Sequence, residues 1–271
     1  MSKFLLKVTP VVFFSLLLAV GVHAATIEVI SSGAFYATME ELKPAFEAKT
    51  GHKVHLQSGS SMGASVTAIP NRLKRGETFD LIILSGSQLD KMIADGFALK
   101  GSRVDLVHSS IGMMVHKGQP KPDISTKEKF DKVLMNAKSI GYSASASGTH
   151  LAKNVFPTFN EKDYKHIMEK SKLIVGDRVA TWVGRGDLEI GFQQVSEIVP
   201  FTSDSNGTVD LVGPIPAPYQ KVTIFSIGVA NGGKEPVAAQ ELVKFLTDKE
   251  NYPLLMNQGL VPAAIATGKV Q

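Results

Sequence analysis

The serine-rich turn Ser58-Gly59-Ser60-Ser61 has the clearest potential for chemistry in this chain. The apolar residues before it favour a short strand, and the apolar spacing over 62–74 predicts a helix after it. Free N–H groups at a helix N-terminus attract anions, and the hydroxyls of Ser60 and Ser61 add donors. The turn therefore predicts an anion-binding site, with simple helix capping by the serines as the alternative.

Three further turns of small or hydroxyl-bearing residues follow predicted strands. They are Ser31-Ser32-Gly33-Ala34, the segment Ser143–Thr149 and Gly176-Asp177. Ligands of open α/β sheets bind beyond the carboxyl ends of the strands, so such turns face one crevice. The turns contain no catalytic pair of carboxylates, which favours holding an anion over making bonds. Arg178 offers a planar fork for a carboxylate, or is a solvated residue of a helical first turn.

The stretch Gly59-Ser60-Ser61-Met62-Gly63 also matches G-x-S-x-G, the nucleophile elbow of α/β-hydrolases. With Ser61 as nucleophile, Asp80 and either His108 or His150 would complete a triad in that chain order. No HGGG-like oxyanion segment precedes the pentapeptide. A secreted serine hydrolase is therefore kept as the alternative to a binding protein.

The beginning of the chain reads as an export signal. Lys3 and Lys7 precede an apolar run over 11–22, and Val22-His23-Ala24 offers small residues for cleavage. This pattern predicts a signal peptide over 1–24 and a mature protein in the periplasm.

Composition excludes several other classes of protein. The chain has no cysteine, so its stability does not depend on disulfides. Its formal net charge is only +4, and a nucleic-acid-binding surface needs more clustered Lys and Arg. His108 and His116 lack the spacing of metal ligands. We therefore expect no nucleic-acid partner, no protein-ligated metal and no cofactor.

Alternating strand and helix patterns position the polar turns. Strands are predicted at 26–30, 79–84, 139–142, 172–175 and 188–192, and helical patterns at 62–74, 88–94, 178–183 and 237–246. Apolar runs at 104–107 and 111–115 mark one crossing between two halves, and the strand 222–230 is taken as the second crossing. The pattern predicts an α/β protein whose second half repeats the architecture of the first.

Several stretches together resemble the periplasmic molybdate-binding proteins and their relatives, which are components of ABC importers. They are SSG, SGSSMG, FDLIIL, GYSASASGTHLAK, RGDLEIGFQQVSEI and DLVGPIPAP, and the resemblance covers Thr26 to about Pro262. It implies a two-lobe type II periplasmic binding fold with a ligand cleft between the lobes. We expect residues 25–107 plus 233–271 as the first lobe, residues 108–232 as the second, and a monomer.

Carried over by position, the resemblance implies ligand donors from the first lobe at two turns. The family's first serine falls at Ala34, so this turn offers backbone N–H groups of Gly33 and Ala34, or Ser32 through a shifted loop. The second serine falls at Ser60, with Ser61 beside it.

In the second lobe the resemblance implies backbone amides at Ser147, with Gly148 and Thr149 adjoining, and at Gly176-Asp177. The family's tyrosine falls at about Gln194, and Arg178 stands beside the site. These departures keep a small organic acid open as the ligand beside molybdate and tungstate. We expect capture of a small anion and its delivery to an ABC permease in the inner membrane, with presentation to a sensor or chemoreceptor as the alternative output.

Overall fold

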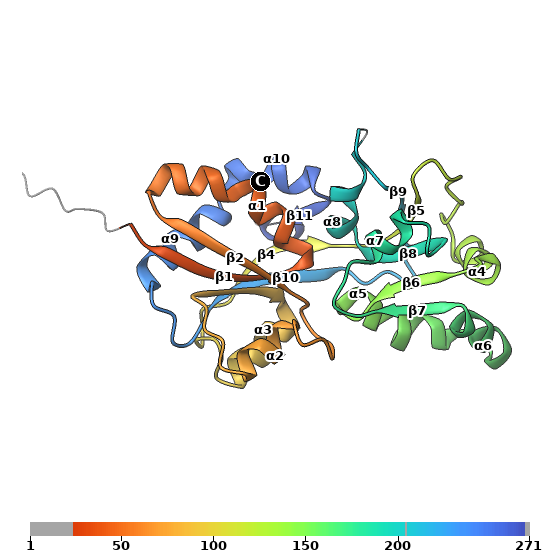
Figure 1. Cartoon of the computed structure of the whole chain (residues 1–271), viewed down its shortest axis with the longest axis horizontal. Coiled ribbons are helices and arrows are strands. Elements are labelled where there is room, and N and C mark those ends of the chain that lie inside the picture. Colours follow the sequence, from red (N-terminus) through yellow and green to blue (C-terminus); the bar gives the residue numbers. More distant parts are fainter. Residues whose placement is uncertain (1–23, 204, 269–271) are drawn as a thin grey trace, which may run out of the picture.

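The computed structural model describes residues 24–203 and 205–268. Within them the chain forms two α/β lobes, each with its own sheet, and Figure 1 shows the lobes side by side. The predicted α/β two-lobe class is confirmed. The predicted signal peptide lies outside the described residues except for Ala24. Among the helices of the described part, none is both long and apolar enough to span a bilayer.

The first lobe contains a six-stranded sheet in the order β11-β4-β10-β3-β1-β2. Strand β1 runs parallel to both β2 and β3, so the carboxyl ends of these three strands lie along one edge. The strands are β1 (Thr26–Ser32), β2 (Lys53–Gly59), β3 (Leu81–Ser85), β4 (Val104–Ser109), β10 (Thr223–Val229) and β11 (Leu260–Pro262).

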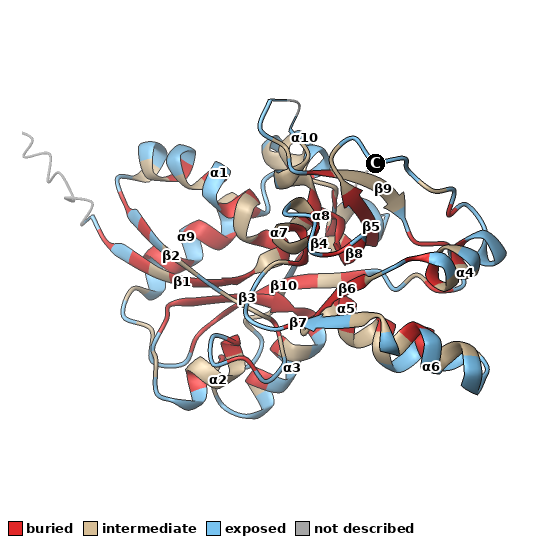
Figure 2. Ribbon diagram, turned by 45° about the vertical axis from the view of Figure 1, so that its right-hand side comes forward, coloured by how far each residue is buried: buried red, intermediate tan, exposed pale blue. Residues whose placement is uncertain are grey.

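Helices cover both faces of the first sheet (Figure 1). On one face lie α1 (Gly33–Thr50), α9 (Pro236–Leu246) and α10 (Tyr252–Asn257), and on the other lie α2 (Ile69–Lys74) and α3 (Gly86–Ala94). The lobe also contains the 3-10 turn Lys249–Asn251 and the short helix α11 (Ala263–Ala266). Figure 2 shows buried residues gathered along the strands and on the helix sides that face them.

The second lobe contains a five-stranded sheet in the order β7-β6-β8-β5-β9. Strand β6 is parallel to β7 and β8, which again aligns their carboxyl ends. The strands are β5 (Ile111–His116), β6 (Ile140–Ser143), β7 (Ser171–Ile174), β8 (Ile190–Gln194) and β9 (Val209–Pro214).

Two separate apolar clusters flank this second sheet. One contains Phe130 and Phe192, whose ring centroids lie 5.7 Å apart, and packs α4 and α6. The other packs α7 and α8 through Val179, Val183 and Ile198. The helical segments are α4 (Lys127–Asn136), α5 (Ala146–His150), a π turn (Leu151–Val155), 3-10 turns (Phe156–Thr158 and Val199–Phe201), α6 (Glu161–Glu169), α7 (Val179–Gly184) and α8 (Val195–Ile198).

Two segments connect the lobes, and one lies earlier than expected. The first is the step from β4 to β5 at Ser110, close to the predicted boundary at 107/108. The second lies between Pro214 and Thr223, whereas we predicted the boundary at 232/233. The apolar strand at 222–230 is β10, which pairs with β3 and β4 inside the first sheet and is apolar because it is buried there.

The predicted helix over 62–74 is largely a loop. Only Ile69–Lys74 is helical, and Pro70 stands in its first turn. Gly63 has a φ of 108°, a left-handed conformation that favours glycine and interrupts a helix. Ser60 and Ser61 therefore do not lie at the start of a helix. The expected helix N-terminus is absent at this turn, and the two serines offer their hydroxyls within a loop.

Asp80 joins three elements of the first lobe. Its side chain is 3% exposed, and Oδ2 accepts a hydrogen bond from Glu28 N at 2.8 Å. Oδ1 accepts from Lys234 N at 2.6 Å and from Glu235 N at 2.8 Å, just before α9. One buried carboxylate thus satisfies three backbone donors and fixes α9 against β1.

Replacing Asp80 by Ala should lower the free energy of unfolding by about 3 kcal/mol or more, because buried N–H groups would lose their acceptor. Urea unfolding of the mature protein measures the change. Asp187→Ala is the control, since Asp187 pairs with Arg185 at the surface and should change stability by less than about 1 kcal/mol. Equal stabilities of the two variants would contradict this role of Asp80.

Candidate functional site

A cleft of about 300 Å³ lies between the lobes, at the carboxyl ends of parallel strands from both sheets. Ligands of α/β sheets bind at such strand ends. The first lobe contributes Gly33, Ser58, Gly59, Ser60 and Thr67, and the second contributes Ser143, Ala144, Ser145, Ile174, Gly176, Asp177, Arg178, Gln193 and Glu197.

A small pocket continues the cleft inward. The two spaces share Gly33, Ser145 and Glu197. The inner pocket is lined by Ser32, Gly33, Ala34, Ser61, Ser145, Ala146, Ser147, Gln194, Glu197 and Phe225. All of the predicted site residues therefore line one continuous space, except Gly148 and Thr149, which line neither part.

Gly148 and Thr149 serve the local fold instead. A Cβ on Gly148 would lie 1.8 Å from Ser143 O, so glycine lets α5 pack closely over the end of β6. Thr149 N donates to Ser145 O at 2.9 Å within α5. Both residues thus hold the turn that carries Ser147, whose Oγ lies 3.1 Å from Ser143 Oγ.

The hydroxyls of the first lobe differ in how they are used. Ser32 Oγ is buried, lines the inner pocket and has no hydrogen-bond partner among the described residues. Ser61 Oγ accepts from Ser85 N at 3.0 Å, which leaves its own proton to donate. Ser60 Oγ donates to Met62 O at 2.8 Å and shapes the loop. Ser85 Oγ is also buried without a partner but does not line the cleft, so among the cleft-lining hydroxyls of the first lobe Ser32 is the one most in need of a partner, such as a ligand.

Arg178 presents a positive charge to the cleft. Its guanidinium lies between two rings, 5.9 Å from the centroid of Tyr36 in the first lobe and 5.6 Å from that of Phe201 in the second. Its side chain makes no hydrogen bond or ion pair with the residues that the structure describes. The neighbouring Asp177 carboxylate makes no ion pair with this guanidinium and accepts from Arg178 N at 2.7 Å and from Trp182 Nε1 at 3.0 Å.

Glu197 is a cleft residue that the sequence analysis missed. It lies on α8, and its carboxylate abuts Gly33, where a Cβ would be 2.1 Å from Oε1. Oε2 accepts a long hydrogen bond of 3.4 Å from Gln194 N. Burial raises the pKa of Glu197 to about 7, although Arg178 and the Gln194 hydrogen bond act in the opposite direction. The one sequence signal was the capping-box spacing of Gln194 and Glu197 directly after a buried strand.

Gln194, expected beside the ligand, also ties the lobes together. In the amide orientation that satisfies both of its atoms, Gln194 accepts from Thr223 Oγ1 and donates to the carbonyls of Ser109 and Ser110, each at 3.1 Å. These partners belong to both connecting segments. The neighbouring Gln193 lines the main cleft, and its Oε1 accepts from Ala180 N at 3.0 Å, which leaves its amide nitrogen as a donor.

The lobes meet closely around the cleft. A Cβ on Gly63 of the first lobe would lie 2.3 Å from Ala144 O of the second, and one on Gly176 would lie 3.3 Å from Ser65 Oγ. Together with the contact between Gly33 and Glu197, these approaches enclose the cleft from several sides. The described conformation is therefore one in which both walls could contact the same small ligand.

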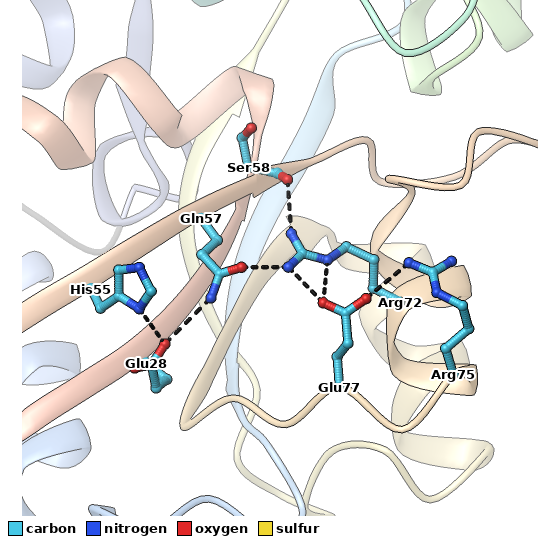
Figure 3. Close-up of polar contacts among 7 residues, drawn as sticks. All are labelled: Glu28, His55, Gln57, Ser58, Arg72, Arg75 and Glu77. Carbon is cyan, nitrogen blue, oxygen red and sulfur yellow. Dashed lines mark hydrogen bonds and ion pairs between the residues drawn. The ribbon is translucent and has the colours of Figure 1, made fainter.

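Figure 3 shows a polar network between the end of β2 and the residues of α2 and the loop after it. Arg72 Nη1 donates to Ser58 O at 3.2 Å, and Arg72 Nε donates to Glu77 at 2.7 Å. Arg72 also donates to the side chain of Gln57, which in turn contacts Glu28. The network fixes the end of β2, where Ser58 enters the cleft.

The residues proposed for a hydrolase triad do not come together in the structure. Ser61 is fully buried and bound to Ser85 N at the carboxyl end of β3, whereas Asp80 precedes the opposite end of that strand. His150 Nε2 contacts Tyr219 O at 2.9 Å. The G-x-S-x-G match is therefore a consequence of a serine-rich loop, and the geometry lacks a nucleophile with a neighbouring base.

Comparison with known proteins agrees with this architecture. The model of the bacterial extracellular solute-binding protein family matches residues 27–261. An aconitate isomerase of a Pseudomonas species is 40% identical over 237 residues, 88% of each chain. The molybdate-binding protein ModA of Azotobacter vinelandii is 25% identical over 239 residues, 85% of this chain and 87% of that protein.

A solved structure matches the fold over most of its length. The sulfate-binding protein SubI of Mycobacterium tuberculosis superimposes with a TM-score of 0.70 at 17% identity, covering 90% of this chain and 89% of that one. The resemblance seen in the sequence is thus confirmed, and family membership implies a periplasmic location, a small ligand and an ABC permease as partner. The chain belongs to the bacterial extracellular solute-binding proteins, as a divergent relative of the molybdate-binding proteins.

Proposed function

We propose that the cleft binds a small organic polycarboxylate. The observation that carries this proposal is the guanidinium of Arg178, which lines the cleft and has no hydrogen-bond or ion-pair partner among the described residues. Its planar fork suits a carboxylate, with which it forms two parallel hydrogen bonds. The rings of Tyr36 and Phe201 hold the guanidinium from both lobes, so the group is preorganised for such a ligand.

A second carboxylate group would find donors on the opposite wall. Ser32 Oγ has no partner among the described residues, and the N-terminus of the 18-residue helix α1 begins at Gly33 beside it. Backbone N–H groups at a helix start favour negative charge. Since Arg178 belongs to one lobe and Ser32 to the other, a ligand that bridges them favours the closed arrangement of the lobes.

A tetrahedral oxyanion such as molybdate or tungstate fits this cleft less well. The cavity of about 300 Å³ is in the range for small organic ligands. Ala34 replaces a serine donor of the molybdate-binding proteins, and the amide of Gln194 is engaged with the connecting segments. The carboxyl of Glu197 would also stand next to an ion that only accepts hydrogen bonds.

The relative named aconitate isomerase supports a specific ligand class. Aconitate is an unsaturated tricarboxylate, and that relative shares 40% identity over 88% of this chain. We therefore propose aconitate or a closely similar tricarboxylate as the ligand. As a solute-binding protein, the closed form would deliver it to the permease.

Isomerisation of aconitate is a second candidate function at the same site. It is favoured by the relative's name and by Glu197, a carboxyl in the cleft whose pKa is raised to about 7. A group that titrates near neutral pH is suited to accept and return a proton.

Thermal-shift measurements on the mature protein test the ligand class. We expect cis- or trans-aconitate to raise the melting temperature, because a ligand of the native state stabilises it. Arg178→Leu should weaken the binding by about 30-fold, since it removes a charge-assisted contact of about 2 kcal/mol.

The matched control for that variant is Arg185→Leu. Arg185 ends the same short helix, is exposed and pairs with Asp187, so this variant should bind as the wild type does. A shift with molybdate and none with any tricarboxylate would refute the proposed ligand.

Isomerase activity is tested by incubating the purified protein with cis-aconitate and following trans-aconitate by proton NMR. We expect conversion without an added cofactor, because a proton shift along the allylic carbons needs only an acid–base group. Binding of aconitate without any conversion would leave the protein a solute carrier and would reject the isomerase.

A further inference from the structure

We propose that Glu197 is the acid–base residue that moves the proton in the cleft, an inference that rests on the isomerase candidate. Glu197 lies on α8 of the second lobe and reaches the start of α1 in the first, so it stands where the two walls meet. It lines both the main cleft and the inner pocket. A ligand held by Arg178 and Ser32 would therefore lie against this carboxyl.

Glu197 has a free oxygen with which to act. Oε2 receives only the 3.4 Å hydrogen bond from Gln194 N, and Oε1 has no hydrogen-bond partner among the described residues. The absence of a side chain at Gly33 leaves the space that Oε1 occupies. The backbone around it thus positions this carboxyl, which forms no ion pair with the described residues.

The other ionisable groups of the cleft are committed to different roles. Both oxygens of Asp177 accept hydrogen bonds at the start of α7. Arg178 is a cation, and Tyr36 on α1 packs against its guanidinium. The serine hydroxyls are far weaker bases than a carboxylate. Among the described lining residues, Glu197 is therefore the group suited to take a proton from carbon.

The proposed reaction is balanced without an oxidant or a cofactor. The Glu197 carboxylate takes a proton from the methylene carbon of aconitate, and the electron pair of that C–H bond spreads over the allylic carbons and the adjoining carboxylate. The carboxylic acid, whose proton exchanges with water, then donates a proton to the former vinyl carbon, and the double bond moves by one position. The conformation in which the cleft holds the methylene carboxylate sets the new geometry.

The surroundings of Glu197 support both halves of this transfer. Burial raises its pKa to about 7, so near neutral pH the group exists in both protonation states. The positive charge of Arg178 and the amide end of α1 would stabilise the negative charge that develops on the substrate. Because the carboxylate is the form that removes the first proton, the rate should rise with pH up to about 7 and then level.

The direct test replaces Glu197 by Gln, which keeps the shape and removes the acid–base chemistry. Glu197→Gln should lower the turnover of aconitate at least 100-fold, as loss of a general base does, while thermal shift still reports binding of trans-aconitate. Incorporation of solvent deuterium into the methylene and vinyl positions should be lost as well. Glu169→Gln, an exposed change on α6, should leave activity and exchange unchanged.

The outcomes separate this inference from the proposed function. A Glu197→Gln protein that isomerises aconitate within tenfold of the wild type would overturn the role of Glu197 and leave the isomerase intact. A wild-type protein that binds aconitate but neither isomerises it nor exchanges its protons would overturn both the isomerase and this role, while the binding proposal would stand.

The melting temperature measured as a function of pH tests whether Glu197 titrates near pH 7. Its native pKa of about 7 exceeds the ordinary value of 4.5, so the folded protein holds this proton where the unfolded chain has released it. The contribution to stability is therefore complete below about pH 4.5 and is lost as the pH rises to 7. Glu197→Gln should match the wild-type melting temperature near pH 4.5 and exceed it at pH 8. Parallel profiles at all pH values would contradict the raised pKa.

Discussion

A small anion that leaves water must recover its lost hydrogen bonds from donors that are already in place. In the binding mode we propose, the donors come from two lobes, because Arg178 lines one wall of the cleft and Ser32 with the start of α1 lines the other. Neither wall alone surrounds a ligand. Binding that depends on both walls would require the connections between the lobes and the supports behind each wall to hold the walls in place.

Those supports act on the ends of strands. Asp80 holds β1, β3 and α9 together, and Arg72 fixes the end of β2 behind Ser58. Gln194 joins both connecting segments next to the inner pocket. Asp80 and Gln194 are buried, where an unmade hydrogen bond is costly, and the half-buried Arg72 makes several hydrogen bonds at once, so these groups help to fix the cleft walls.

The sequence predicted most of the fold because strand–turn–helix units have local signals and their order resembles a known family. It failed where tertiary contacts decide the structure. The apolar spacing over 62–74 favoured a helix, but Gly63 and Pro70 confine that helix to 69–74. Most predicted turn residues line the cleft, whereas Glu197 was missed because its environment comes from Gly33, far away in the chain.

We propose that one tricarboxylate spans the two walls of the cleft. A crystal structure of the mature protein with trans-aconitate tests it most directly. We expect one carboxylate to pair with the fork of Arg178, another to lie within hydrogen-bond distance of Ser32 Oγ and the first N–H groups of α1, and the carbon chain to lie against Glu197. Aconitate bound outside the cleft, or bound there with Arg178 turned to solvent, would contradict it.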